Sequence, residues 1–145
     1  MSTPRVDFYI LDSTAPGGRY RFACRVAEKA YQQEHRVYIH SENAVESRQL
    51  DDLLWSFRDN SFIPHDVQAQ RHAEHPLAVI INHTPPDSSE NDLLINLTQD
   101  TPSFSSQFAR IVEIIDQEPS TVQYGRQRYR QYRELGYEMN SHNIG

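Results

Sequence analysis

The sequence predicts an α/β fold, in which helices cover both faces of a mostly parallel β-sheet. Short apolar runs rich in strand formers alternate with longer segments whose apolar residues recur at helical spacing. Parallel strands need crossover connections, and a helix is the usual one, so this alternation favours a parallel sheet. Short apolar strands in that arrangement need cover on both sides. At 145 residues the chain has the common size of one domain, which we expect to span 1–145.

Two strand–helix units open the chain. The run Val6-Asp-Phe-Tyr-Ile-Leu11 ends at a turn signal, Asp12-Ser-Thr-Ala-Pro-Gly-Gly18, and a helical pattern follows it. A second short strand precedes a helix that Ser41 or Asn43 can cap. The predicted elements are a strand at 6–11, a helix at 19–34, a strand at 36–40 and a helix that carries Leu50, Leu53 and Leu54.

The remainder of the chain predicts three more strands and a final helix. Residues 58–76 are polar and predict a loop, interrupted by Phe62-Ile-Pro64. The run 108–115 fits a strand or a short helix, and its β-branched residues favour a strand. Pro119 suits the first turn of the final helix, and Gly136 suits its end. The further strands are predicted at 77–81, 93–97 and 109–115.

Composition and charge narrow the class of protein. The single cysteine, Cys24, excludes an internal disulfide and fits a reducing compartment. The N-terminus lacks a secretory pattern, and no stretch approaches the ~20 apolar residues that span a bilayer, so we expect a cytoplasmic protein without membrane contact. The net charge of −6 argues against nonspecific binding of a phosphate backbone over the whole surface.

Patterns typical of catalysis or metal binding are weak. Gly17-Gly18 completes neither G-x-G-x-x-G nor G-x-x-x-x-G-K-[ST], so a plain turn is the better interpretation. His72-Ala-Glu-His75 lies in a polar loop and fits solvated histidines better than a zinc site. Cys24 lies among apolar neighbours and fits a packed core thiol better than a nucleophile. The sequence therefore predicts no catalytic residue, no metal site and no cofactor.

An aromatic cluster is the first feature that stands out. Trp55, the only tryptophan, lies near a helix end, and Phe57 and Phe62 flank a loop that closes on Pro64. One interpretation is that these residues only cap the core, and on the sequence alone it has the same weight as the alternative. The alternative is a protein-docking patch, because large aromatic side chains supply apolar contact area and have few rotatable bonds to immobilise on binding.

A basic stripe on the final helix is the second feature. Four arginines fall within eight positions of an acidic protein: Arg126, Arg128, Arg130 and Arg133. At about 100° per residue, Val122, Arg126, Tyr129 and Arg133 share one face, and Arg130 lies at its border. The opposite face, which we expect to face the core, carries Tyr124, Arg128, Tyr132 and Leu135. A solvated face is the ordinary interpretation of a charge run, but the interleaved Tyr129 and the net charge of −6 favour a binding surface.

With these segments, the chain resembles the chi subunit family of bacterial DNA polymerase III over nearly its full length. Arg130 occupies a position where lysine is expected in some members, and 64–76 is a variable region. The collinear matches are Phe8-Tyr-Ile-Leu11, Leu53-Leu-Trp55-Ser-Phe57 with Ser61-Phe-Ile-Pro-His65, Leu94-Ile-Asn-Leu97, 108–116, and 126–133 followed by Gly136-Tyr137.

The resemblance implies a fold, a role and two partners. The fold is a three-layer α/β/α arrangement with a Rossmann-like sheet, and the role is that of an accessory subunit without catalytic activity. The partners are the psi subunit, which tethers chi to the clamp loader, and the acidic C-terminal tail of single-stranded DNA-binding protein.

The resemblance also selects which partner each surface binds. We expect psi on Trp55, Phe57, Phe62 and Pro64. We expect the tail on Val122, Arg126, Tyr129, Arg130 and Arg133. An alternative is a nucleotide-binding or hydrolytic enzyme of similar fold. Direct binding of single-stranded DNA through the basic stripe is not expected at a net charge of −6.

Overall fold

The computed structural model describes residues 3–12, 14, 17–56, 65–67 and 79–144. Within these ranges none of the helices is long and apolar enough to cross a membrane. The elements, in chain order, are β1 (Arg5–Leu11), α1 (Gly18–Gln32), β2 (Val37–His40), α2 (Ala44–Ser56), β3 (His65–Val67), β4 (Val79–Asn82), β5 (Leu93–Asn96), the 3-10 helix η1 (Ser105–Gln107), β6 (Arg110–Ile115), α3 (Pro119–Glu134) and β7 (Glu138–Ile144).

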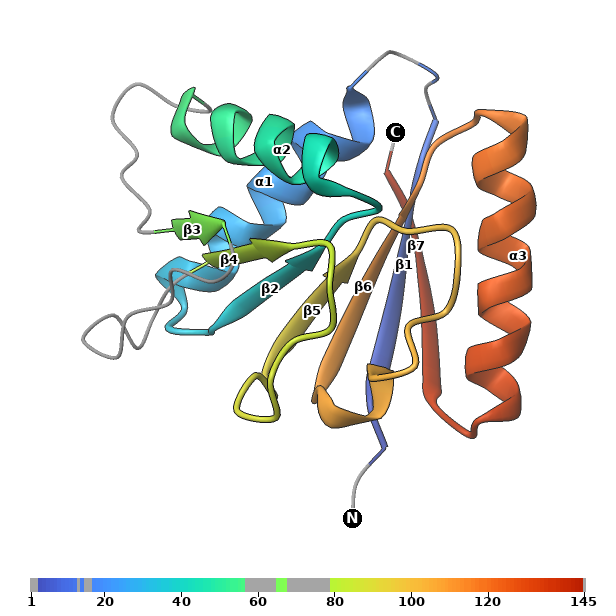
Figure 1. Cartoon of the computed structure of the whole chain (residues 1–145). Coiled ribbons are helices and arrows are strands. Elements are labelled where there is room, and N and C mark those ends of the chain that lie inside the picture. The colour runs from blue at the N-terminus through green and yellow to red at the C-terminus, as the bar shows by residue number, and fades with distance from the viewer. Residues whose placement is uncertain (1–2, 13, 15–16, 57–64, 68–78, 145) are drawn as a thin grey trace.

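The strands form one sheet in the order β3-β4-β2-β5-β6-β1-β7, and every adjacent pair is parallel. Helices α1 and α2 lie on one face of the sheet and α3 lies on the other (Figure 1). The predicted three-layer α/β fold with a parallel sheet is therefore confirmed.

Alternate residues of the strands build two separate cores. In β2, Val37 and Ile39 pack in a cluster with residues of α1 and α2, whereas Tyr38 packs in a cluster that includes Tyr132 of α3. This division follows from the pleat, because successive side chains of a strand point to opposite faces. The prediction for Cys24 is also confirmed, since it is buried in the first cluster and burial raises the pKa of its thiol to about 12.

All five predicted strands are present, with ends shifted by one or two residues, and 110–115 is a strand rather than a helix. Asn43, not Ser41, caps α2, because the Asn43 side chain accepts a hydrogen bond from the Glu46 amide at 2.9 Å. Two strands were not predicted. The short β3 lies inside the segment 58–76, for which the loop prediction is wrong at 65–67.

The second unpredicted strand, β7, follows Gly136 and has the sequence Glu-Met-Asn-Ser-His-Asn-Ile. It is mostly polar because it is an edge strand, which among the described strands pairs only with β1 and keeps much of its surface in solvent. It therefore lacks the apolar run that marks the other strands in the sequence. Its seven register pairs with β1 nevertheless make it an integral part of the sheet.

Candidate functional site

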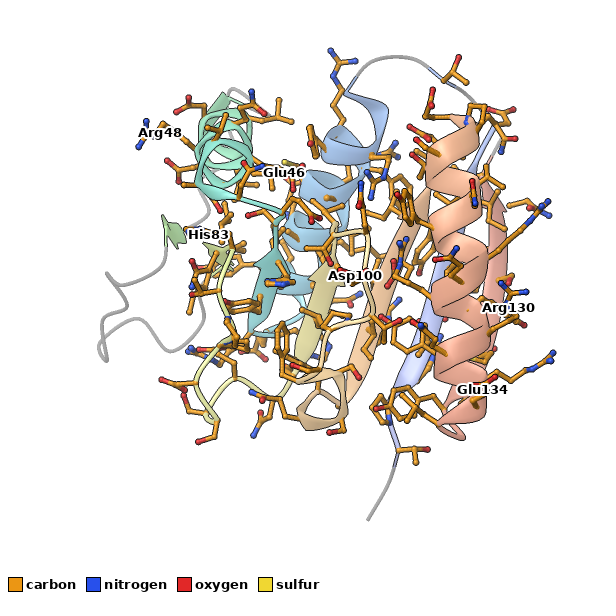
Figure 2. The ribbon with its side chains drawn as sticks, turned by 45° about the vertical axis from the view of Figure 1, so that its right-hand side comes forward. Glu46, Arg48, His83, Asp100, Arg130 and Glu134 are labelled. Atoms are coloured by element: carbon orange, nitrogen blue, oxygen red, sulfur yellow. The ribbon has the colours of Figure 1, made fainter. Side chains whose placement is uncertain are left out.

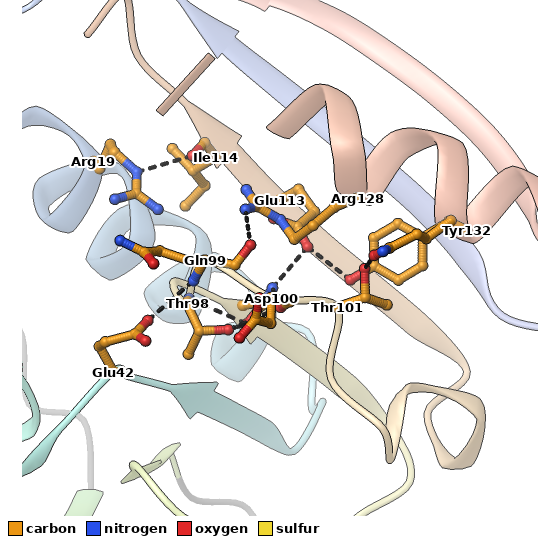
Figure 3. A network of polar contacts seen from close by, with 12 residues as sticks. Arg19, Glu42, Thr98, Gln99, Asp100, Thr101, Glu113, Ile114, Arg128 and Tyr132 are labelled. Atoms are coloured by element: carbon orange, nitrogen blue, oxygen red, sulfur yellow. Dashed lines mark hydrogen bonds and ion pairs between the residues drawn. The ribbon is translucent and has the colours of Figure 1, made fainter. Parts of the chain in front are cut away.

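A buried polar network holds α3 against the sheet. Glu113 of β6 is 0% exposed, and its carboxylate accepts hydrogen bonds from Arg128 Nε at 2.9 Å, Tyr132 Oη at 2.7 Å and Asn96 Nδ2 at 2.8 Å. Arg128 Nη1 also donates to the Gln99 carbonyl at 2.8 Å, and Figure 3 shows Glu113, Arg128, Tyr132 and Gln99 gathered between α3 and the sheet. Burial, and then the Glu113 carboxylate, raise the pKa of Tyr132 well above its usual value, so the phenol stays protonated and donates.

This network decides which arginines of the final helix can meet a partner. Arg128 is 2% exposed and already paired, so its charge serves the attachment of α3. Arg126, Arg130 and Arg133 are exposed, as their position on the helix predicts. The predicted inward face is confirmed for Arg128 and Tyr132. It is wrong for Leu135, which is 54% exposed. The helix α3 ends at Glu134, so Leu135 is the residue that caps its C-terminus and is no longer part of the helix face that packs on the sheet.

Beside the exposed arginines, a pocket of about 280 Å³ opens between α3 and the sheet. Phe8 and Ile10 of β1 and Ile115 line it from the sheet. Tyr129 of α3 is half-buried, and its ring centre lies 5.3 Å from that of Phe8. The residues that line the pocket from α3 are Val122, Gly125, Arg126 and Tyr129.

Gly125 sets how closely α3 approaches the strands at this pocket. A Cβ at this position would lie 2.6 Å from Ile115 Cδ1, well inside van der Waals contact. Any larger residue would require the Ile115 side chain to shift, so glycine lets the helix backbone sit this close to the sheet without displacing it. The pocket depends on that approach, because Ile115 and Val122 line it together.

The structure brings part of the predicted tail-binding set together. Val122, Arg126 and Tyr129 line the pocket, whereas Arg130 and Arg133 are exposed and lie outside it. Arg126 and Arg130 also border a shallow depression on the outer surface of α3. Figure 2 shows Arg130 and Glu134 projecting from that helix. The result is an apolar pocket with one guanidinium in its wall and two more along the same helix.

Sequence reasoning missed the half of this pocket that the sheet supplies. The alternation of strand residues places Phe8 and Ile10 on one face of β1, so the sequence did contain a signal for these two. Ser141 of β7, which also lines the pocket, carried no such signal because β7 was not predicted.

Trp55, the one described residue of the second predicted surface, lies on a helix toward the opposite end of the sheet. Trp55 belongs to the last turn of α2, which contacts β3 and β4, and β3 is the edge strand at that end. Phe57, Phe62 and Pro64 lie outside the described residues, so their assignment to a docking patch stays a prediction.

The described residues hold no group of three or more histidine, cysteine, aspartate or glutamate side chains that could bind a metal ion. His72 and His75 fall outside the described ranges, and His83 is exposed.

At the turn after β1, Gly17 adopts a left-handed conformation with φ of 78°, and Arg19 Nε donates to the Ile114 carbonyl at 3.0 Å.

Comparison with known proteins identifies the family. Residues 3–140 match the family model described as DNA polymerase III chi subunit, HolC. DNA polymerase III subunit chi of Pseudomonas aeruginosa is 42% identical over 140 residues, which cover 97% of this chain and 96% of that protein. The subunit chi of Escherichia coli is 29% identical over 138 residues, covering 92% and 94%.

A solved structure supports the fold alone. The crystal structure of T4 UvsW matches with a TM-score of 0.65 at 10% identity. This chain is covered over 96% of its length but spans only 41% of that chain. The family match, by contrast, extends over nearly the whole sequence and includes both α3 and the α2–β3 segment. This chain therefore belongs to the DNA polymerase III chi subunit family, whose members are accessory subunits of that replicative polymerase.

Proposed function

We propose that this chain is a cytoplasmic, non-catalytic replication adaptor. One surface binds the psi subunit of the clamp loader, and the other binds the acidic C-terminal tail of single-stranded DNA-binding protein. The adaptor thereby links DNA polymerase III to protein-coated single-stranded DNA. The observation that carries the proposal is the apolar pocket beside α3, with Arg126 in its wall and Arg130 and Arg133 on the same helix of an acidic protein.

The chemistry of such a tail fits the features of this pocket. The family resemblance implies a tail that ends in acidic residues, an apolar pair and a terminal phenylalanine with a free carboxylate. The terminal ring enters the pocket against Tyr129 and Val122, which are both half-buried. We assign the carboxylate to Arg126, because it is the arginine that lines the pocket, and its planar fork can hold a carboxylate bidentately. Arg130 and Arg133 face the upstream acids.

A peptide titration tests the tail-binding surface. Hydrogen bonds to charged groups contribute about 1.5–3 kcal/mol, so Arg126→Ala should weaken binding of a fluorescent tail peptide roughly 10- to 100-fold. Arg133→Ala should weaken it less and should mainly reduce the salt dependence, as an exposed contact does. The exposed Arg48 of α2 provides the matched control, Arg48→Ala, which should bind like the unaltered chain. Indifference to Arg126→Ala and to amidation of the peptide would remove this surface from the proposal.

The psi-binding surface has a separate test. An aromatic hot spot contributes at least about 2 kcal/mol, so Trp55→Ala should weaken the heterodimer with purified psi by that amount. Isothermal titration calorimetry measures the difference directly. Val45 is an apolar residue on the same helix and is 65% exposed, so Val45→Ala is the control that should bind normally. Equal affinities for the two variants would contradict the assignment of psi to this aromatic cluster.

A further inference from the structure

A second groove lies on the face of the sheet that α3 does not cover. It has a volume of about 620 Å³, and the C-terminal half of α1 forms one wall while β1 and β6 supply Tyr9 and Arg110. Phe8 and Tyr9 are consecutive in β1 and therefore point to opposite faces. The sheet itself thus separates this groove from the pocket beside α3.

Cations dominate the rim of this groove. Arg25 and Lys29 line the groove and are exposed, and the exposed Arg21, one turn earlier, continues the same row along α1. The ion pairs among the described residues involve four other arginines and two histidines, and none involves Arg25 or Lys29. The Arg25 guanidinium lies 5.8 Å from the centre of the Phe22 ring. Two positive charges of this row are thus free of a carboxylate partner in the described part of the chain.

The acids in this region are buried beneath the cations. Asp7 is 0% exposed and pairs with Arg110 at 2.7 Å, Arg5 at 3.2 Å and His142 at 3.1 Å. One carboxylate therefore faces two guanidiniums, and the cluster stays positive without any charge on His142. Glu28, the acid that lines the groove from α1, is buried and makes its own contacts. The accessible surface of the groove is consequently basic in a protein of net charge −6.

The aromatic rings in the groove are packed on one another. Tyr9 stacks on His142 at 4.8 Å and packs against Phe22 at 5.3 Å, and Phe22 is in turn near Arg25. Nucleic-acid bases bind by stacking on the free face of a ring. Here the rings already contact His142, each other and the Arg25 guanidinium, and together with Val26 they supply the apolar part of the groove lining. The groove therefore suits an apolar side chain better than a base.

The spacing of the cations suits an extended peptide. Residues four apart on a helix rise about 6 Å along its axis. Side chains two apart on an extended strand lie about 6.6–6.8 Å apart and point the same way. Acidic residues at alternate positions of an extended peptide can therefore follow the row Arg21, Arg25 and Lys29 in register.

We infer that this groove docks an extended acidic peptide from a protein partner, with acids at alternate positions and one intervening large apolar side chain. The acids contact the cation row of α1, and the apolar side chain contacts Phe22, Val26 and Tyr9. This site neither depends on the tail-binding proposal nor uses its residues. A peptide without a free terminal carboxylate tests it separately, because the proposed tail site needs that carboxylate.

The probe is a seven-residue acetylated and amidated peptide, Ser-Asp-Leu-Asp-Ser-Asp-Ser, titrated into the ¹⁵N-labelled full chain. Amide shifts should change at Tyr9, Phe22, Arg25 and His142 and not at Tyr129. A peptide of the same composition with clustered acids, Asp-Asp-Asp-Leu-Ser-Ser-Ser, should bind more weakly. Shifts confined to the surroundings of Tyr129, no shifts at all, or equal binding of the two peptides would overturn the inference.

Charge reversal tests which cations take part. Exposed ion pairs contribute up to about 1 kcal/mol, so Arg25→Glu or Lys29→Glu should weaken the alternating peptide about fivefold. Arg48→Glu makes the same charge change on α2 and should alter its affinity less than about twofold. An oligothymidine ten nucleotides long is the competing probe. Tighter binding of the oligonucleotide, lost in Arg25→Glu, would assign the groove to nucleic acid and contradict the inference.

Discussion

The two ends of the sheet are built differently. At one end, β7 pairs with β1 along seven positions, and α3 is attached through the buried carboxylate of Glu113. At the other end, β3 pairs with β4 along three positions, and most residues of the predicted psi surface belong to the connection between α2 and β3. A partner at α3 meets side chains already held on a helix, which lowers the entropy cost of binding. The α2–β3 end carries its predicted anchors on a connection, where scaffolds often place binding residues.

The largest expected effect comes from breaking the support under α3. Glu113→Ala leaves Arg128 buried without its carboxylate, which should lower the free energy of unfolding by about 3–5 kcal/mol. Urea denaturation measures this change. The same variant should lose tail binding more than psi binding, because two of the three side chains that bind this carboxylate, Arg128 and Tyr132, belong to α3. A loss below about 1 kcal/mol would show that the network does not hold the helix.

A smaller effect is expected from moving α3 away from the sheet. Gly125→Ala places a methyl group against Ile115, and such overpacking costs about 1–3 kcal/mol of stability. Thermal unfolding measures the cost, and peptide titration should show weaker tail binding because the pocket is distorted. Ser120→Ala, at an exposed position in the first turn of α3, is the control. Unchanged tail affinity in Gly125→Ala would mean that the pocket does not depend on this close approach.

The smallest expected effect is on how stability depends on pH, through Asp7, which lies on the face of β1 opposite the pocket beside α3. Burial alone would raise the pKa of Asp7, but hydrogen bonds from His142 and Arg110 and the charges of Arg110 and Arg5 outweigh it and lower the pKa below 3.8. A lowered carboxyl pKa contributes stability that is complete above the unfolded value and is lost as pH falls through the folded value. The stability difference between the unaltered chain and Asp7→Asn should therefore shrink below about pH 4. Urea midpoints at pH 7 and pH 2.5 measure it, and a constant difference would contradict the ion-pair account.

Regular apolar signals made most of the fold predictable. The strands that became β1, β2, β4, β5 and β6 are covered on both faces, so their sequences are mostly apolar, apart from buried polar residues such as Asp7 and Glu113. The edge strand β7 is less covered, with none of its residues fully buried, and it is mostly polar, so its pairing with β1 could be found only in the structure. A local sequence pattern cannot reveal a pairing between two segments that lie more than 130 residues apart in the chain.

Helical geometry separated the arginines of α3 but did not complete the site. It correctly placed Arg128 inward and Arg126 outward. It could not show that Phe8 and Ile115 would complete a pocket, since they come from strands distant in sequence. The assignment of psi to Trp55, Phe57, Phe62 and Pro64 stays a prediction that the titration with Trp55→Ala addresses.

The position of β1 between β6 and β7 also bears on synthesis of the protein. Both neighbours of β1 lie about a hundred residues or more downstream, so β1 has no strand partner while the middle of the chain is being made. At about 5–20 residues per second, this interval lasts roughly 5–20 seconds. The pocket beside α3 needs β1, α3 and β7 together, whereas α2 and β3 lie in the first half of the chain. A prematurely terminated chain would therefore lack the pocket even where it retained the segment of the predicted psi surface.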